Sequence, residues 1–407
     1  MSRIHASIQG LLVVGVDSVS VATSARKAGY KVYAADYFGD LDLKRACSAI
    51  ESMVHQKPGK SSGKMRSKFK PETFLKMARR LITKFMIDAI VLSSGLDDNF
   101  DMLCELDALA PILGNSPQTI EKVRRKPEVF EELESLGIAH PETAVAENLD
   151  EAEAKADEIG YPLVIKPVAG FGGVGVRIAR DSRSLQSNFS EVSAFGREVV
   201  VQKLIGGVHA SISFLSTSKH STVLTVNEQL LGLPFLFQPQ PFGYCGNVVP
   251  LRVVDSLFEK CRQIVHTVAS HFELRGSNGI DVVISEDGTP YVIEVNPRFQ
   301  GTLECVERAL GINIVESHIN ACLKGSLPTI EKQPATVSTR LVLYAPNKVK
   351  APDLTTIREA RDIPLPASIV EKSEPVCSIV TEGRSRGSSF NSAKKLARSV
   401  YSMLSAV

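Results

Sequence analysis

No apolar run in the 407-residue sequence is long enough to cross a membrane. The longest runs, such as residues 89–92 and 230–237, are far short of the roughly 20 apolar residues that a transmembrane helix requires. The first residues also lack the long apolar region and cleavage site of a signal peptide, and residues 11–16 fit a first strand better. We therefore expect a cytoplasmic protein without a membrane partner.

An excess of one charge is missing as well. The 47 Lys and Arg residues nearly balance the 45 Asp and Glu residues, so the net charge of +2 gives no reason to predict a nucleic-acid partner. The seven cysteines include no CxxC pair, and their odd number argues against a disulfide framework and for a reducing compartment. A chain of this length and composition is expected to form two or three globular domains.

The N-terminal region lacks the GxGxxG motif of a dinucleotide site. Residues 10–36 nevertheless predict strand, turn, helix and strand, which is the start of a parallel, doubly wound sheet. Asp36 and Asp40 either form turns and caps or meet a ligand. Asp97 and Asp98 follow a predicted strand at residues 88–93, and open α/β sheets bind ligands at such carboxyl ends.

Residues 159–179 also lack the GxxxxGK[ST] pattern of a P-loop, and they predict a hairpin with a glycine-rich tip instead. Glycine lets backbone N–H groups approach phosphate oxygens without obstruction, and Lys166, in the strand before the tip, supplies a cation. A merely flexible hairpin tip is the alternative. The glycines in question are Gly170, Gly172, Gly173 and Gly175.

The segment 279–301 is the most informative part of the sequence, and it predicts two strands joined by a turn. Asp281 lies on the first strand, while Glu294 and Asn296 lie two residues apart on the second and therefore share a face. Two carboxylates and an amide oxygen suit Mg²⁺, and Arg298 suits developing negative charge. The alternative is an ordinary hairpin with solvent-facing carboxylates, which the apolar second strand disfavours.

The remaining segments predict connecting structure. Residues 56–70 are basic and contain Gly and Ser, which indicates a mobile surface loop, and residues 230–250 indicate a shaped loop without regular structure. Residues 302–325 predict one helix, in which His318 is expected to be a core residue. The tail predicts strands near 337–343 and 375–381 and a helix at 391–405.

These segments, in this order, resemble the ATP-grasp superfamily over essentially the whole chain, and within it most closely the predicted ATP-dependent carboligases. The resemblance implies an α/β and α+β chain with an N-terminal doubly wound parallel sheet. It implies a pre-ATP-grasp domain at 1–115, a small lid subdomain at 116–207, a large subdomain with the metal site at 208–330, and a C-terminal extension at 331–407 packed on the ligase core.

The resemblance also assigns site residues. Arg298 would be catalytic, and Asp281, Glu294 and Asn296 would hold Mg²⁺ or Mn²⁺. Asp97, Asp98 and Asn247 would contact the substrate. The ATP-binding residues would be Lys126, Lys166, Gly170, Gly172, Gly173, Gly175, Gln202, Lys203, Leu204 and Ile205.

The activity that the resemblance implies is ATP-dependent carboxylate–amine ligation through an acyl phosphate, with a small-molecule acid and amine as partners and with a homodimer as the expected assembly. The alternatives are another phosphoryl or carboxyl transfer, or nucleotide binding without catalysis. The last is motivated by Lys203 and Gly206, which stand where relatives carry a glutamate near the base and the ribose. Since lysine has no acceptor for an adenine amino group, backbone carbonyls or Gln202 would take that role.

Overall fold

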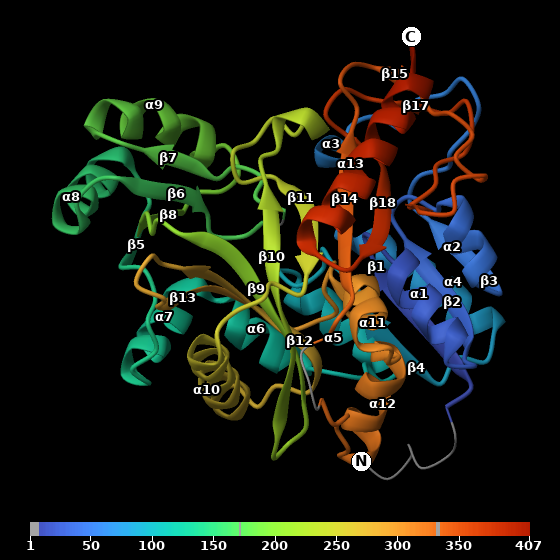
Figure 1. The fold of residues 1–407 in the computed structure, drawn as a ribbon, viewed down its shortest axis with the longest axis horizontal. Helices are drawn as coiled ribbons and strands as arrows, with labels where there is room; N and C mark the ends of the chain where they lie inside the picture. Colours follow the sequence, from blue (N-terminus) through green and yellow to red (C-terminus); the bar gives the residue numbers. More distant parts are fainter. Residues whose placement is uncertain (1–7, 171, 331–333) are drawn as a thin grey trace.

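The computed structural model describes residues 8–170, 172–330 and 334–407, and of Lys126 it describes the backbone only. Figure 1 shows the N-terminal domain on one side, the lid subdomain on the other, and a large sheet between them with the C-terminal strands and helix above. Within the described ranges, no helix combines the length and apolar character needed to cross a lipid bilayer.

The N-terminal domain is built on a four-stranded parallel sheet with strand order β3-β2-β1-β4. Alternate residues of β1 face opposite sides: Leu11 and Val13 join one core, and Leu12 and Val14 join the other. Both faces are therefore covered, as predicted for a doubly wound sheet. Its elements are β1 (Gly10–Gly15), α1 (Val19–Lys27), β2 (Lys31–Asp36), α2 (Leu41–Ala46), β3 (Ala49–Ser52), α3 (Met65–Lys68), α4 (Pro71–Lys84), β4 (Ala89–Leu92) and α5 (Phe100–Leu109).

The lid subdomain contains an antiparallel sheet of order β5-β8-β6-β7 with two helices that share one core with it. The glycine-rich segment connects β6 to β7, so the predicted hairpin is present. The elements are β5 (Thr143–Ala146), α8 (Leu149–Ile159), β6 (Leu163–Pro167), β7 (Arg177–Ala179), α9 (Ser182–Ser193) and β8 (Val199–Lys203).

The largest sheet has eight strands in the order β13-β12-β9-β10-β11-β14-β18-β16. Because β11 pairs with β14, the strands after residue 330 continue the sheet formed by residues 208–296. Its strands are β9 (Val208–Ser216), β10 (Ser221–Leu231), β11 (Tyr244–Val249), β12 (Gly276–Ile284), β13 (Pro290–Asn296), β14 (Val337–Tyr344), β16 (Ala360–Arg361) and β18 (Pro375–Gly383).

Helices pack around this sheet and join it to the N-terminal domain. Helices α6, α7 and α10 share one core with β9, β12 and β13, whereas α11 and α12 pack against α1 and the N-terminal sheet. The helices are α6 (Pro117–Arg124), α7 (Lys126–Ser135), α10 (Asp255–His271), α11 (Leu303–Leu310), α12 (Ile314–Lys324) and α13 (Arg386–Met403). A three-stranded sheet is formed by β15 (Val349–Lys350), β17 (Ile369–Val370) and β19 (Ser405–Ala406).

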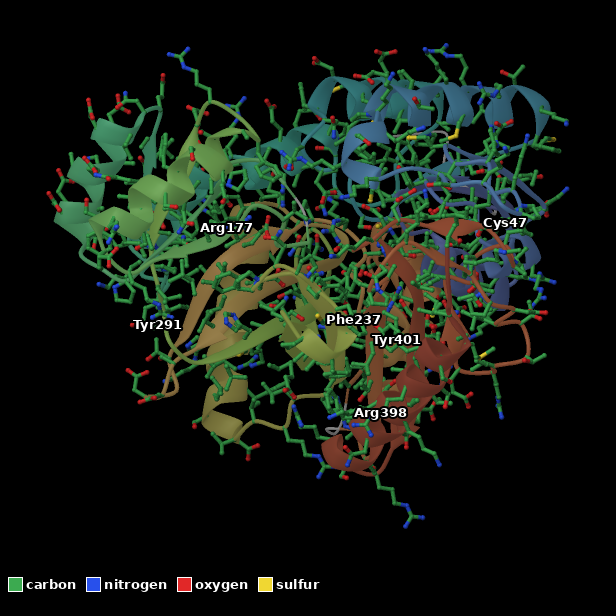
Figure 2. The ribbon with its side chains drawn as sticks, turned by 90° about the horizontal axis from the view of Figure 1, so that it is seen from above. Cys47, Arg177, Phe237, Tyr291, Arg398 and Tyr401 are labelled. Atoms are coloured by element: carbon green, nitrogen blue, oxygen red, sulfur yellow. The ribbon has the colours of Figure 1, made fainter. Side chains whose placement is uncertain are left out.

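Two predicted loops carry more structure than their composition indicated. The segment 230–250 contains the end of β10, a short 3₁₀ helix (Pro234–Leu236) and β11. It also packs on α13, where the rings of Phe237 and Tyr401 meet edge to face at 5.0 Å (Figure 2). The segment 56–70 is docked rather than loose, since Ile369 donates to the Lys60 carbonyl at 3.0 Å. The glycine, proline and charged residues of these two segments indicated an irregular backbone. They did not indicate which other segment each one packs against.

The predicted single helix at 302–325 is two helices. Gly311 adopts a φ of +71° and ends α11, and Asn313 then caps α12 by accepting from the Glu316 N–H. The last helix begins at Arg386, five residues before the predicted start, because Ser385 and Ser388 form a capping box.

Candidate active site

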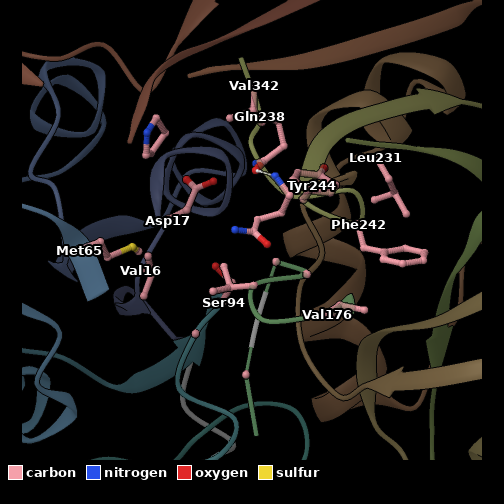
Figure 3. Close-up of a pocket in the computed structure, with 18 of the residues that line it drawn as sticks. Val16, Asp17, Met65, Ser94, Val176, Leu231, Gln238, Phe242, Tyr244 and Val342 are labelled. Carbon is pink, nitrogen blue, oxygen red and sulfur yellow. Dashed lines mark hydrogen bonds between the residues drawn. The ribbon is translucent and has the colours of Figure 1, made fainter. Parts of the chain in front are cut away.

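One large cavity lies where the N-terminal domain, the lid and the large sheet meet. It has a volume of about 850 Å³, and its lining includes Asp97, Lys166, Asp281 and Arg298 from four different elements or loops. Figure 3 shows Asp17, Val16 and Met65 on one side of this cavity, and Phe242, Val176 and Leu231 on the other. Most of the residues that the sequence singled out therefore face one enclosed space.

The three predicted metal ligands come together at the end of the β12–β13 pair. The register sets Asp281 opposite Glu294 and Gly279 opposite Asn296. The Asn296 amide Nδ2 donates to Asp281 Oδ2 at 3.2 Å, and Gln229 Nε2 from β10 donates to Asp281 Oδ1 at 2.8 Å. The antiparallel register thus converts a two-residue spacing in sequence into a cluster of oxygen donors.

This cluster is short of positive charge at Asp281. Burial, and next the negative charge of Glu294, raise the pKa of Asp281 to about 7. No group of three or more His, Cys, Asp or Glu side chains suited to a metal occurs in the described ranges, so a metal here would rely on two carboxylates and the Asn296 oxygen. Such a set fits Mg²⁺, which commonly takes one or two carboxylates together with substrate phosphates.

Arg298 is held by a buried ion pair with Asp97. Its Nε donates to Asp97 Oδ2 at 2.5 Å, and its Nη2 donates to Asn296 Oδ1 at 3.1 Å. Asp97 comes from the loop after β4 in the N-terminal domain, so the pair crosses from that domain to the large sheet. The predicted substrate residue Asp97 therefore fixes the predicted catalytic residue in place.

Arg124 is a site residue that the sequence analysis missed. This nearly buried guanidinium at the end of α6 donates to Asp98 Oδ1 at 2.6 Å, to Glu294, and to the Gly170 carbonyl at 3.3 Å. Burial alone would lower the pKa of Arg124, but Glu294 and Asp98 raise it. The only sequence signal was its place two residues before Lys126 in a basic run, which is also typical of an exposed helix end.

The lysines of the lid subdomain have different surroundings. Lys166 Nζ donates to Gln202 Oε1 at 2.9 Å, and Gln202 in turn donates to Thr143 at 2.7 Å. Lys203 donates its ammonium to the carbonyls of Gly160 at 2.8 Å and Tyr161 at 3.2 Å. The Lys203 charge thus caps the end of α8, which ends at Ile159, while Gln202 stays beside Lys166.

The glycine-rich lid is docked onto the segment before β11. The Tyr244 N–H donates to the Gly172 carbonyl at 3.2 Å. Gly173 packs so closely that an added Cβ would lie 1.9 Å from the Phe242 carbonyl oxygen. Gly172, Gly173 and Gly175 have φ values of +64°, +74° and +82°, which explains the need for glycine at each.

The other predicted residues have fewer described contacts. Leu204 and Ile205 line the cavity directly after β8. Asn247 also lines it and accepts a hydrogen bond from the Tyr244 hydroxyl. Lys126 begins α7, but its side chain lies outside the described part of the structure.

Comparison with known proteins gives the same architecture. Residues 123–302 match the family model described as an ATP-grasp domain. The chain is 25% identical to an uncharacterised protein of Methanocaldococcus jannaschii over 377 residues, covering 91% of this chain and 88% of that protein. It is also 28% identical to the carbamoyl phosphate synthase large chain of Pyrococcus furiosus over 219 residues, which is 53% of this chain but only 20% of that protein.

Two solved structures resemble the whole chain. The biotin carboxylase domain of Hydrogenobacter thermophilus 2-oxoglutarate carboxylase, solved with MgADP, ADP and bicarbonate, has a TM-score of 0.75 at 18% identity and covers 99% of this chain and 91% of that one. The L-amino acid ligase of Bacillus licheniformis has a TM-score of 0.71 at 19% identity, with 98% of both chains covered. At these identities the likeness concerns the fold. Residues 123–302 are therefore an ATP-grasp domain, and the chain as a whole has the ATP-grasp fold.

Proposed function

We propose that the protein is an ATP-dependent ligase that joins a small-molecule carboxylate to an amine through an acyl phosphate. The observation that carries this proposal is that Asp281, Glu294 and Asn296 face the same cavity as Lys166, the glycine lid and Arg298. Oxygen donors for a divalent cation, a lysine and a closing backbone loop are what a triphosphate needs for binding and transfer.

ATP would lie between the lid and the large sheet. Lys166 and the backbone of residues 170 and 172–175 would contact the phosphates, and Gln202, Leu204 and Ile205 would border the base. Mg²⁺, held by Asp281, Glu294 and Asn296, would neutralise phosphate charge. The biotin carboxylase domain solved with MgADP supports this assignment by its similar fold.

The proposed reaction has two steps. A carboxylate oxygen of the acid attacks the γ-phosphorus, the bond to the ADP oxygen breaks, and an acyl phosphate forms. The amine nitrogen then attacks the acyl carbon, the bond to the phosphate oxygen breaks, and the nitrogen loses a proton. Arg298 would stabilise the negative charge that develops, and the docked lid would keep water from hydrolysing the acyl phosphate.

The geometry favours an active enzyme over a protein that only binds nucleotide. That alternative was motivated by Lys203 and Gly206. The Lys203 ammonium, however, donates to the carbonyls of Gly160 and Tyr161. Gln202, with an acceptor oxygen and amide hydrogens, takes the place beside Lys166 instead. The substrate roles of Asp97, Asp98 and Asn247, the role of Lys126, the four domain boundaries and a homodimer remain part of the proposal.

The test is ADP release from Mg·ATP with a panel of carboxylic acids and amines. We expect turnover that needs an acid and an amine together, that stops when Mg²⁺ is chelated, and that falls by roughly a hundredfold or more in Arg298→Ala. Arg262→Ala serves as the matched control, because Arg262 pairs with Glu259 on an exposed helix face.

The outcomes separate the candidate functions. ADP release that depends on bicarbonate and needs no amine would support a carboxyl transfer instead. Nucleotide binding without turnover under any pair of substrates would support a binding protein. Undiminished ligation by Arg298→Ala would exclude the proposed role of that side chain.

A further inference from the structure

The cavity extends beyond the proposed ATP site to an acidic end. We define the acidic end by six residues that line the cavity near β1, β2 and the C-terminal strands: Asp17, Tyr37, Asp40, Arg340, Tyr344 and Asp362. Asp17 and Asp40 follow β1 and β2, so they lie at the carboxyl edge of the N-terminal parallel sheet. Ligands of open α/β sheets bind at that edge, and Figure 3 shows Asp17 projecting beside the pocket there.

Carboxylates outnumber cations at the acidic end. Arg340 is buried, and its Nη2 donates to both Asp17 at 3.0 Å and Asp362 at 2.7 Å. Asp40 is also buried, and Gln56 donates to it at 2.8 Å. In the described part of the chain, Asp40 forms no ion pair, and the single guanidinium of Arg340 serves both Asp17 and Asp362.

Two more carboxylates lie directly behind these. Asp36 accepts from the backbone N–H groups of Phe38 and Gly39, and Asp42 accepts from those of Asp362 and Ile363. Burial, and next the negative charge of Asp362, raise the pKa of Asp17 to about 6. Burial, and next the negative charge of Asp36, raise the pKa of Asp40 well above its usual range. The negative charge of the cluster therefore exceeds the positive charge of Arg340, and a bound cation would offset the excess.

Two residues of the cavity lining each carry a buried polar atom that lacks a hydrogen-bond partner in the part of the chain that the structure describes. Among the described residues, neither the Tyr37 hydroxyl nor Asp97 Oδ1 has a hydrogen-bond partner, although Tyr37 is only 2% exposed and Asp97 only 7%. Buried polar groups of this kind normally have a partner. Asp97 also holds Arg298 through its other oxygen, so it belongs to the proposed reacting centre.

The walls around these charges are apolar and aromatic. Tyr37 meets Phe38 edge to face at 4.8 Å and Phe69 at 6.4 Å, and Met65 and Val376 also line the cavity. Carboxylates set among aromatic rings suit a ligand that has both a positive charge and an apolar body.

We propose that the acidic end binds the amine substrate as a cation with an apolar body, and that Asp17 is its principal charged partner. This inference rests on the proposed ligase function, because it assigns the second substrate of that reaction. The proposal restricts the amine substrate to hydrophobic amines. It predicts weak binding of neutral or anionic molecules of the same shape at the acidic end.

The test compares two probes of one shape: 2-phenylethylamine and 2-phenylethanol. Each is titrated calorimetrically into the full-length protein with Mg²⁺ and a non-hydrolysable ATP analogue. We expect the amine to bind at least about tenfold more tightly than the alcohol, and Asp17→Asn to weaken amine binding by about tenfold or more.

Asp42→Asn is the matched control, because it removes a carboxylate from the same cluster that is absent from the cavity lining and bound to backbone N–H groups. It should change amine affinity by less than about threefold, since it alters the surrounding field without removing a direct contact. Melting temperatures of both variants report whether they are folded. The comparison of amine with alcohol on the unmodified protein needs no variant.

The proposal is overturned if the alcohol binds as well as the amine, if neither of the two binds, or if both Asp variants weaken the amine equally. Failure of the nucleotide analogue to bind would count against the proposed ligase function. Binding of the analogue without selectivity for the amine would count against the acidic end alone.

Discussion

The Arg124 guanidinium supplies the positive charge that a bound cation would supply at the same place. Its guanidinium neutralises Asp98 and Glu294 and also donates to the lid carbonyl of Gly170. A buried ion pair that loses one partner leaves an uncompensated charge, which costs far more than the loss of an exposed pair. The stability of the site therefore depends on Arg124 most strongly when no divalent cation is bound.

We predict that Arg124→Ala lowers the free energy of unfolding by about 3–5 kcal/mol without Mg²⁺. Excess Mg²⁺ should restore part of the loss, because a cation beside Glu294 replaces the missing charge. Urea denaturation with and without Mg²⁺ measures both effects. The adjacent Arg125→Ala, which removes a pair with Glu121 whose arginine side chain is 59% exposed, should change stability by no more than about 0.5 kcal/mol. Identical losses at both Mg²⁺ levels would contradict this role.

The three predicted metal ligands lie together for a local reason. Asp281, Glu294 and Asn296 were within reach of sequence reasoning because one turn and a period of two fix their common position. Arg124 was not, because its partners Asp98 and Glu294 lie 26 and 170 residues away. Lys203 was assigned to ATP because a strand position does not reveal that an adjacent helix end will take its ammonium.

The lid is the tip of the β6–β7 hairpin. Its docked position depends on glycine for two separate reasons, a positive φ and close packing against another segment. Gly172 and Gly173 both have positive φ values, but only at Gly173 would an added Cβ meet a neighbouring backbone, that of Phe242. Across the cavity, Arg66 of α3 lies 3.9 Å from the Phe195 ring centroid of the lid subdomain. The segment 56–70, predicted as a mobile loop, thus contributes to holding the lid subdomain in place.

We predict that Gly173→Ala impairs the enzyme much more than Gly172→Ala does. Both substitutions impose a strained φ, worth roughly 1–2 kcal/mol, but an added Cβ at Gly172 meets nothing within 4 Å whereas at Gly173 it collides with a carbonyl. The expected result is that KM for ATP rises by tenfold or more above that of Gly172→Ala, since each 1.4 kcal/mol or so of lost docking energy corresponds to a factor of about ten. Steady-state kinetics measures this, and equal kinetic parameters for the two variants would show that the docked position is unimportant.

The site forms only because the N-terminal domain, the lid subdomain and the large sheet are held in fixed positions relative to one another. The α11–α12 pair packs on the N-terminal sheet, and His318 of α12 lies at the junction. The Ser277 N–H donates to His318 Nδ1 at 2.7 Å, which leaves Nε2 to donate to the Leu113 carbonyl at 3.0 Å. His318 is a core residue, as the sequence predicted. Its bond to the Leu113 carbonyl, which joins α12 to the N-terminal domain, could not be predicted, because Leu113 lies 205 residues away in sequence.

This junction predicts a pH dependence of stability with a definite sign. Burial lowers the pKa of His318 to about 4, although its hydrogen bond to Leu113 opposes part of that effect. The unfolded histidine takes up a proton below about pH 6.5, whereas the folded one does not until about pH 4. The unfolded state therefore gains stability as the pH falls through this window, and the folded protein loses up to about 3 kcal/mol from this group.

We predict that His318→Gln, which keeps one acceptor and one donor but cannot titrate, removes this contribution. The difference in unfolding free energy between the unmodified protein and the variant should stay constant above pH 6.5 and change by up to about 1.4 kcal/mol per pH unit below it. Chemical denaturation from pH 7.5 to 4.5 measures the difference, and His220→Gln in an exposed turn is the matched control. Parallel stability curves for the protein and His318→Gln would mean that the histidine is not held neutral, and the junction would then need a different electrostatic explanation.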